Sequence, residues 1–277
     1  MAYKTILVHL DAGERCAARV EAAVQLACRH DSHLIGLNAL SVNELSDYVL
    51  TGAGSAPLIE FRKRAAAEQA ARAEAVFARA VTLAGLTKTE WRTSTRDAVD
   101  AVTLHARYAD LLVLGQPEAP RTSGVAAGFA EYVTLAAGRP VLMIPRAGSF
   151  ATIGRRVLVG WNASREATRA ITDAIPLLQQ ADVVQILAFN PRPDEHGALP
   201  GADIGLYLAR HGVRVDVKVD HTKDIDVGNE LLSRAADLDA DLMVMGAYGH
   251  SRLKELVMGG ASRTVIDTMT MPVMLSH

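Results

Sequence analysis

The chain repeats itself, and this repetition limits its possible folds more than any other feature of the sequence. Three blocks occur twice in the same order: Thr5–Asp11 matches Arg156–Asn162, Ala109–Gly115 matches Ala240–Gly246, and Pro140–Met143 matches Pro272–Leu275. The first pair is offset by 151 residues and the other two by 131 and 132, so the second copy lacks about 20 residues after its first block. Three ordered matches predict two copies of one domain, at residues 1–147 and 153–277.

Each copy alternates short apolar runs with Ala-rich helical patterns. Continuous runs of Val, Leu and Ile are typical of parallel strands that helices cover on both faces. The predicted strands are residues 5–10, 34–39, 90–94, 110–114 and 140–144 in the first copy, and 156–161, 183–189, 214–219, 241–245 and 272–275 in the second. Helical patterns include residues 60–84 and 227–236. We therefore predict two tandem doubly wound α/β domains, each with a five-stranded parallel sheet, joined by a linker at residues 145–149.

Composition excludes several classes of protein. With 277 residues, 49% hydrophobic and 22% charged, the chain can bury a core and is not disordered. Its net charge of −2 and scattered Lys and Arg residues argue against nucleic-acid binding. It lacks an apolar run of the roughly 18 residues that cross a bilayer, and its N-terminus does not resemble a signal peptide. Cys16 and Cys28 lie too far apart on one predicted helix to pair, so we expect them buried and reduced in a cytoplasmic protein.

The segment from Gly246 to Arg263 carries the strongest functional pattern. It follows a buried strand and leads into a helix, and its glycines let backbone approach a ligand closely. Unpaired amides at a helix N-terminus, here Gly259, Gly260 and Ala261, can bind phosphate. The Ser262 hydroxyl could donate to the same oxygens or cap the helix.

This pattern resembles the universal stress protein family, whose nucleotide-binding members carry Gly-x2-Gly-x9-Gly-Ser/Thr after the fourth strand. Gly246, Gly249 and Gly259 fit the spacing, while Gly260 stands where the family has a hydroxyl and Ser262 supplies one nearby. The resemblance covers the whole chain as a tandem pair. It implies an adenine nucleotide α-hydrolase-like fold, with the two copies packed as an intramolecular pseudo-dimer whose last strands, 140–144 and 272–275, run antiparallel.

The resemblance further implies binding of ATP or AMP, with Mg²⁺ as the accompanying ion, at the ends of the first, second and fourth strands. The residues carried over are Trp161, Asn162, Ala188, Phe189, Met245, Gly246, Gly249, Gly259, Gly260, Ala261 and Ser262. The family commonly has Asp at the position of Asn162, so this site keeps an acceptor but loses a charge.

The first copy keeps Asp11 but departs from the glycine pattern. Glu118 stands opposite Gly249, and Gly128 is followed by Phe129, Ala130 and Glu131 where the second copy has Gly260, Ala261 and Ser262. A carboxylate at a phosphate position repels the ligand. We expect this copy to be degenerate and free of nucleotide, with a structural or dimerisation role.

Several other signals have two interpretations. Residues 42–56 and 190–201 each follow a second strand. Each is either a functional loop, serving as a lid or a partner contact, or simply a long surface connection. No general base, Walker loop or metal site is evident in the sequence, so we do not expect an enzyme. The resemblance to the family implies a role in stress response or signalling. The alternatives are a stress protein that binds a protein partner without nucleotide, and a slow ATPase. A homodimer is a further alternative that the sequence leaves undecided.

Overall fold

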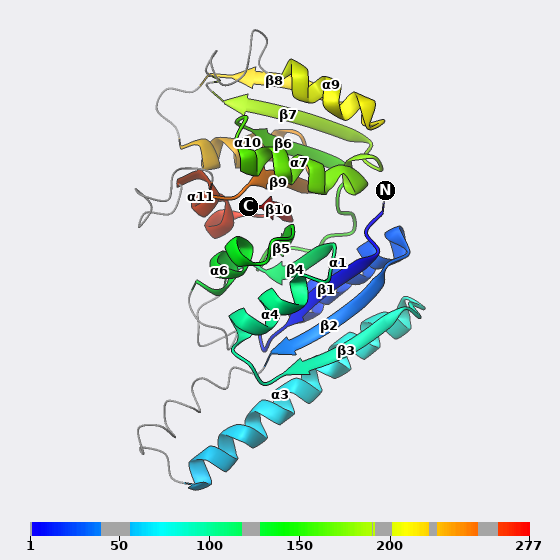
Figure 1. The fold of residues 1–277 in the computed structure, drawn as a ribbon, viewed down its shortest axis with the longest axis vertical. Coiled ribbons are helices and arrows are strands. Elements are labelled where there is room, and N and C mark those ends of the chain that lie inside the picture. Colours follow the sequence, from blue (N-terminus) through cyan, green and yellow to red (C-terminus); the bar gives the residue numbers. More distant parts are fainter. Residues whose placement is uncertain are drawn as a thin grey trace. The chain divides into compact units, whose positions relative to one another are not determined.

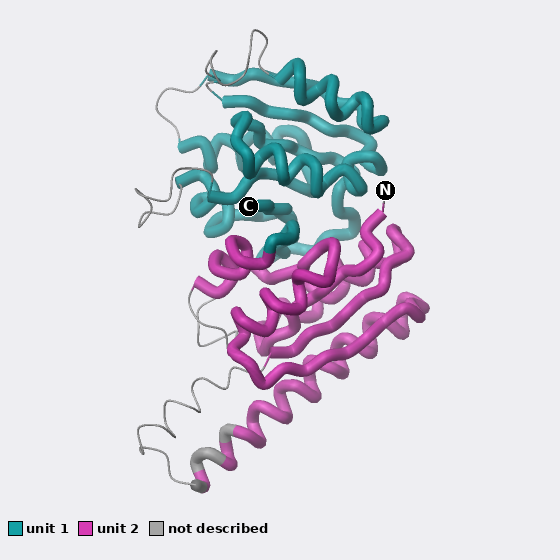
Figure 2. The backbone as a smooth tube through the Cα atoms, viewed as in Figure 1, with its two compact units in different colours: residues 1, 138–277 teal, residues 2–137 magenta. Residues whose placement is uncertain are grey.

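A computed structural model describes residues 2–39, 56–117, 128–189, 191, 201–221, 226–248 and 260–277. It divides into two compact units, residues 2–137 and residues 138–277, here called the N-terminal and C-terminal units (Figure 2). The predicted loops at 42–56 and 190–201 fall largely outside the described residues. No described helix is long and apolar enough to cross a membrane.

The N-terminal unit is built on four parallel strands in the order β3-β2-β1-β4 (Figure 1). Its elements are β1 (Thr5–Leu10), α1 (Cys16–His30), β2 (His33–Ala39), α3 (Ala56–Leu83), β3 (Thr89–Ser94), α4 (Ala98–Ala106), β4 (Leu111–Gly115) and α6 (Phe129–Ala136). Helix α1 packs with α3, and α4 packs with α6, so helices cover the sheet in two pairs.

The C-terminal unit repeats this order with five parallel strands, β10-β9-β6-β7-β8, and adds one antiparallel strand, β5. Its elements are β5 (Val141–Ile144), β6 (Arg156–Trp161), α7 (Arg165–Leu178), β7 (Val183–Phe189), α9 (Ala202–Arg210), β8 (Asp216–Asp220), α10 (Val227–Asp237), β9 (Leu242–Gly246), α11 (Gly260–Thr268) and β10 (Val273–Ser276). The tandem doubly wound α/β fold is confirmed, and all ten predicted strands form within two residues of their expected bounds.

The pairing of β5 with β10 is antiparallel, with Leu142 opposite Met274. This confirms the expectation that the last strands of the two copies run against each other. Strand β5 comes from the first copy in the sequence, yet it clusters with the C-terminal unit because it pairs with β10. The pairing gives β10 hydrogen-bond partners on both sides, so it presents no free edge.

Two aspartates at the amino ends of the fourth strands hold the first strands in register. Asp110 accepts hydrogen bonds from the Lys4 and Thr5 amides at 2.7 and 3.0 Å. Asp241 accepts from the amides of Gly154, Arg155 and Arg156. Both carboxylates are therefore structural, and neither lies at the carboxyl edge of the sheet where α/β folds bind ligands.

The two cysteines are free, as expected, but only one is buried. Cys16 is buried at the start of α1, whereas Cys28 is exposed. The expectation of two buried thiols was wrong for Cys28, because α1 turns this position away from the sheet.

Candidate functional site

The carboxyl edge of the second copy brings together the ends of three neighbouring strands. Strand β6 lies between β7 and β9, and Trp161 at its end pairs with Ala188 of β7. Trp161 and Phe189 are partly exposed there, and Asn162 is exposed. Ala188 and Met245 are 0% and 6% exposed, so their side chains belong to the core. Of these residues, only Trp161, Asn162 and Phe189 offer side chains to a ligand.

Asn162 is held in a tight turn between β6 and α7. Its Oδ1 accepts a hydrogen bond from the Ser164 amide at 3.2 Å, and Ala163 between them has a left-handed φ of 57°. Ser164 then caps α7 by accepting from the Ala167 amide. Because the turn engages the carboxamide oxygen, the NH2 group is the part of Asn162 directed to hydrogen-bond acceptors.

Gly246 serves the packing of the fold. A Cβ at this position would lie 2.5 Å from the Ala167 nitrogen and 2.7 Å from the Glu166 carbonyl carbon. The first turn of α7 therefore crosses directly over the end of β9. The expectation that Gly246 makes room for a ligand has to be corrected, because the space that its missing side chain leaves is taken by helix backbone.

The N-terminus of α11 is open with respect to the described residues. Among the described residues, a Cβ on Gly260 would have only the Asp226 Oδ1 atom within 4 Å, at 3.7 Å, so their packing does not require glycine here. Gly260 is exposed and Ala261 partly exposed, which leaves first-turn amides of a helix accessible. Such a terminus fits a phosphate group. Gly249 and Gly259, the other predicted glycines of this loop, lie outside the described residues.

Ser262 is not a helix cap, because it lies inside the first turn of α11. Its buried hydroxyl oxygen accepts a hydrogen bond from the Tyr248 amide at 3.3 Å, and so ties the helix to the turn that follows β9. Tyr248 has a left-handed φ of 58°. The hydroxyl hydrogen of Ser262 remains a donor in this arrangement.

His277 is a residue of this edge that the sequence reasoning missed. Its Nδ1 lies 3.0 Å from the Ala247 carbonyl oxygen, and the Ala247 amide donates to the Ser276 carbonyl at 2.8 Å. The end of β10 thus fixes the turn at Ala247 from one side, while Ser262 fixes it from the other. The glycine motif gave no indication that His277 belongs to this edge, because His277 lies 28 residues beyond Gly249 in the sequence.

The equivalent edge of the first copy is filled by an ion pair. Arg19 of α1 donates to both carboxylate oxygens of Asp11, at 2.5 and 3.1 Å, and the two side chains are 5% and 10% exposed. Burial alone would raise the pKa of Asp11, but Arg19 and the Gly13 amide lower it below its usual value. A Cβ on Gly115 would lie 2.6 Å from the Arg19 guanidinium, so this glycine makes room for the arginine.

The helix N-terminus of the first copy is also closed. Phe129, the first residue of α6, is 7% exposed, and its ring centroid lies 5.0 Å from that of His9. Glu131 adds a carboxylate to the same first turn. Glu118 lies outside the described residues. An arginine, a phenylalanine and a glutamate thus occupy the region that is open in the second copy.

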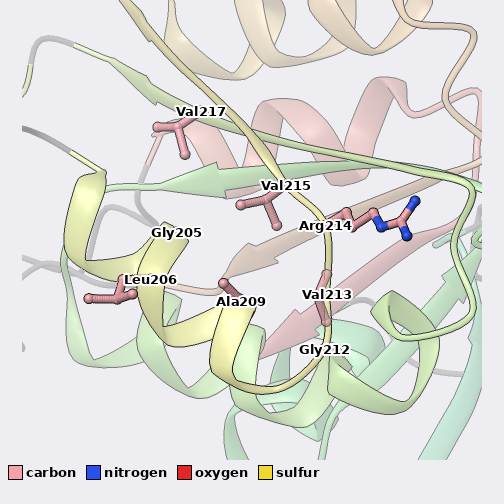
Figure 3. Close-up of a pocket in the computed structure, with 8 residues that line it drawn as sticks. All are labelled: Gly205, Leu206, Ala209, Gly212, Val213, Arg214, Val215 and Val217. Carbon is pink, nitrogen blue, oxygen red and sulfur yellow. The ribbon is translucent and has the colours of Figure 1, made fainter.

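Among the described residues, neither a metal-binding cluster nor a pocket extends the site. No group of three His, Cys, Asp or Glu side chains among them could hold a metal ion. A shallow hollow of about 660 Å³ lies between α9 and β8 (Figure 3). Its lining is apolar apart from Arg214 and includes Gly205, Ala209, Val213 and Val217. It flanks the sheet away from the ends of β6 and β9.

Comparison with known proteins gives one family. The profile of the Universal stress protein family matches residues 2–145 and again residues 154–277. The universal stress protein Slr1230 of Synechocystis is 26% identical over 171 residues, which cover 60% of this chain. The match spans 57% of the length of that relative.

Solved structures of similar fold cover nearly the whole chain. A universal stress protein from Archaeoglobus fulgidus superposes with a TM-score of 0.73 at 17% identity, covering 98% of this chain and 95% of that one. The functionally unknown protein PA1789 from Pseudomonas aeruginosa gives a TM-score of 0.60 at 15% identity, covering 99% and 92%. A universal stress protein solved in complex with cAMP covers a smaller share, 53% of this chain and 100% of that one, at 25% identity and a TM-score of 0.34.

Proposed function

The chain belongs to the universal stress protein family as a tandem of two copies, and from this we propose that it binds ATP or AMP in its second copy alone and acts in stress response or signalling. The proposed domains are residues 1–147 and 153–277. The nucleotide would contact the edge formed by Trp161, Asn162 and Phe189, with its phosphates at the first turn of α11.

The observation that carries this proposal is the open N-terminus of α11. Gly260 is exposed, and the packing of the described residues does not require a glycine there, so its backbone can approach an anion. Aligned peptide dipoles give this terminus a partial positive charge. The Asn162 NH2 group and the exposed part of Trp161 lie at the carboxyl edge of the same unit, where doubly wound folds bind nucleotides.

The same reasoning argues against a nucleotide in the first copy. Displacing Arg19 from Asp11 would leave a buried charge uncompensated, which costs several kcal/mol by comparison with other buried pairs. Phe129 and Glu131 block the start of α6 with bulk and negative charge. We therefore assign the first copy a structural or dimerisation role.

We propose binding without turnover, in a cytoplasmic protein. Phosphoryl transfer needs a positioned base and groups that neutralise the leaving oxygen. The described residues of the edge supply amides, a carboxamide and a serine hydroxyl, and Ser262 already accepts a hydrogen bond from Tyr248. When bound, Mg²⁺ would neutralise phosphate charge. Release of phosphate in proportion to protein concentration would instead support a slow ATPase.

Calorimetry of the full chain with ATP and with AMP tests the proposal. The wild-type chain should bind one nucleotide, and Gly260→Glu should abolish binding because it adds a carboxylate to the open first turn. Ala202→Glu is the matched control, since Ala202 is likewise an exposed first residue of a helix, α9, in the same unit. Gly259→Glu should act like Gly260→Glu, whereas Glu131→Ser in the first copy should change binding little.

Two results would contradict the assignment. No heat at saturating nucleotide, with a folded wild-type chain, would favour the interpretation that the protein binds only protein partners. Equal losses from Gly260→Glu and Glu131→Ser would contradict a single site in the second copy.

A further inference from the structure

The N-termini of α10 and α11 lie against each other in the C-terminal unit. A Cβ on Gly228, in the first turn of α10, would lie 2.7 Å from the Thr264 Cβ and 2.8 Å from the Ala261 carbonyl oxygen of α11. Glycine at this position lets the two helices approach closely. The positive ends of two helix dipoles are therefore adjacent.

A carboxylate lies between these two ends. Asp226 caps α10, and its Oδ2 accepts a hydrogen bond from the Asn229 amide at 3.2 Å. Its other oxygen, Oδ1, lies 3.7 Å from the position that a Cβ on Gly260 would take. One side chain thus caps α10 and at the same time places a negative charge at the open first turn of α11.

The described arginines of α10 and α11, Arg234 and Arg263, form their ion pairs with other carboxylates than Asp226. Asp226 is exposed, and no described Lys or Arg side chain forms an ion pair with it. Because Asp226 Oδ1 lies close to Gly260, a phosphate bound at the α11 terminus would meet both the attraction of the amides and the repulsion of the carboxylate. Each further phosphate charge adds repulsion without adding a first-turn amide.

We propose that Asp226 is a specificity-determining residue, which selects against ligands with a high phosphate charge. The inference rests on the proposed nucleotide site in the second copy. It assigns that site a preference for the less charged adenine nucleotide, AMP over ATP, when no divalent cation accompanies the phosphates. A cation bound to the phosphates weakens the discrimination, because it lowers the charge that Asp226 meets.

The first copy provides a matched control. Asp97 caps α4 in the same way, since its Oδ1 accepts from the Val99 amide at 2.9 Å. Helix α4 is followed by α6, whose first turn is closed by Phe129. Asn caps helices as well as Asp does, so Asp226→Asn and Asp97→Asn each remove one charge and keep the cap.

The experiment measures dissociation constants for ATP and AMP with the full chain, in a chelator and at low salt. Asp226→Asn should tighten ATP binding more than AMP binding, by about three-fold for each additional phosphate charge. The effect should shrink at high salt or with added Mg²⁺. Asp97→Asn should leave both constants unchanged, and thermal melting should confirm that both variants fold.

The outcomes distinguish a failure of the role proposed for Asp226 from a failure of the proposed nucleotide binding. If the ratio of the two constants is the same in wild type and Asp226→Asn, or if the variant weakens ATP binding, the role of Asp226 is refuted while nucleotide binding stands. If wild type and both variants bind neither nucleotide, the proposed function fails, and the inference fails with it.

Discussion

Replacing His9 with leucine should make the N-terminal unit less sensitive to acid. His9 lies at the end of β1, 1% exposed, with its ring against Phe129. Both ring nitrogens lack hydrogen-bond partners among the described residues. Burial lowers the pKa of His9 from 6.5 to about 4, while Asp11 raises it and Arg19 lowers it by smaller amounts.

The sign and size of the effect follow from this pKa. Between pH 6.5 and about 4 the unfolded chain binds a proton at His9 and the folded chain does not. The free energy of unfolding is therefore unaffected above pH 6.5 and falls as the pH decreases through this window. The loss from His9 amounts to about 2 kcal/mol between pH 7.5 and 5.0 and approaches about 3 kcal/mol below pH 4.

The chain contains a convenient probe for this measurement. It has two tryptophans, Trp91 in the N-terminal unit and Trp161 in the C-terminal unit. In a Trp161→Phe background, urea unfolding followed by fluorescence reports the N-terminal unit through Trp91. We expect His9→Leu to reduce the difference in unfolding free energy between pH 7.5 and 5.0 by about 2 kcal/mol.

Two comparisons make the test specific. His30, 3% exposed, also has its pKa lowered to about 4, so His30→Leu should reduce the acid sensitivity similarly. The exposed His221 serves as a control, and His221→Gln should change nothing in the N-terminal unit. An unchanged pH dependence in His9→Leu, with a folded protein, would refute the argument that burial keeps this histidine neutral.

Two further predictions concern packing, and urea unfolding measures both. Arg19→Met should destabilise the N-terminal unit by about 3–5 kcal/mol, because it leaves the carboxylate of Asp11 buried without its partner. The double variant Arg19→Met/Asp11→Leu should recover much of that loss. Equal stability of the single and double variants would contradict this reasoning. Gly246→Ala should cost about 1–3 kcal/mol because its Cβ would meet the Ala167 nitrogen, whereas Gly260→Ala should be neutral or stabilise α11 by up to about 1 kcal/mol. A larger loss from Gly260→Ala would mean that its first turn is not open.

Motif reasoning pointed to the loop between β9 and α11 as the candidate site, and the structure changes the roles of some residues that it named. Gly246 and Gly260 were both expected to let a ligand reach the backbone, although Gly246 accommodates backbone of α7 and, of these two glycines, only Gly260 is exposed. A glycine pattern indicates where side chains are excluded, but it does not indicate whether a ligand or another part of the protein excludes them. Ser262 was likewise expected at a helix end and lies within the first turn.

The sequence does contain an indication of the ion pair between Arg19 and Asp11. Arg19 occupies a position on the apolar face of α1, between the buried Cys16 and Val20, and eight residues after Asp11. A charged side chain on the core face of a helix usually has a buried partner. The sequence contains no comparable indication that Asp226 lies near Gly260. An aspartate that caps a helix is common, and the two residues are 34 positions apart.

The sequence by itself determined the tandem repeat and the ten strands, because continuous apolar runs are typical of strands in a sheet that helices cover. The antiparallel pairing of the last strands of the two copies was implied by the resemblance to the family. Tertiary structure alone decided how the two carboxyl edges differ. Arg19 reaches Asp11 across the first edge, and Asp226 meets Gly260 across a helix contact in the second copy. Such differences depend on how closely neighbouring helices pack, and spacing along the chain does not encode that distance.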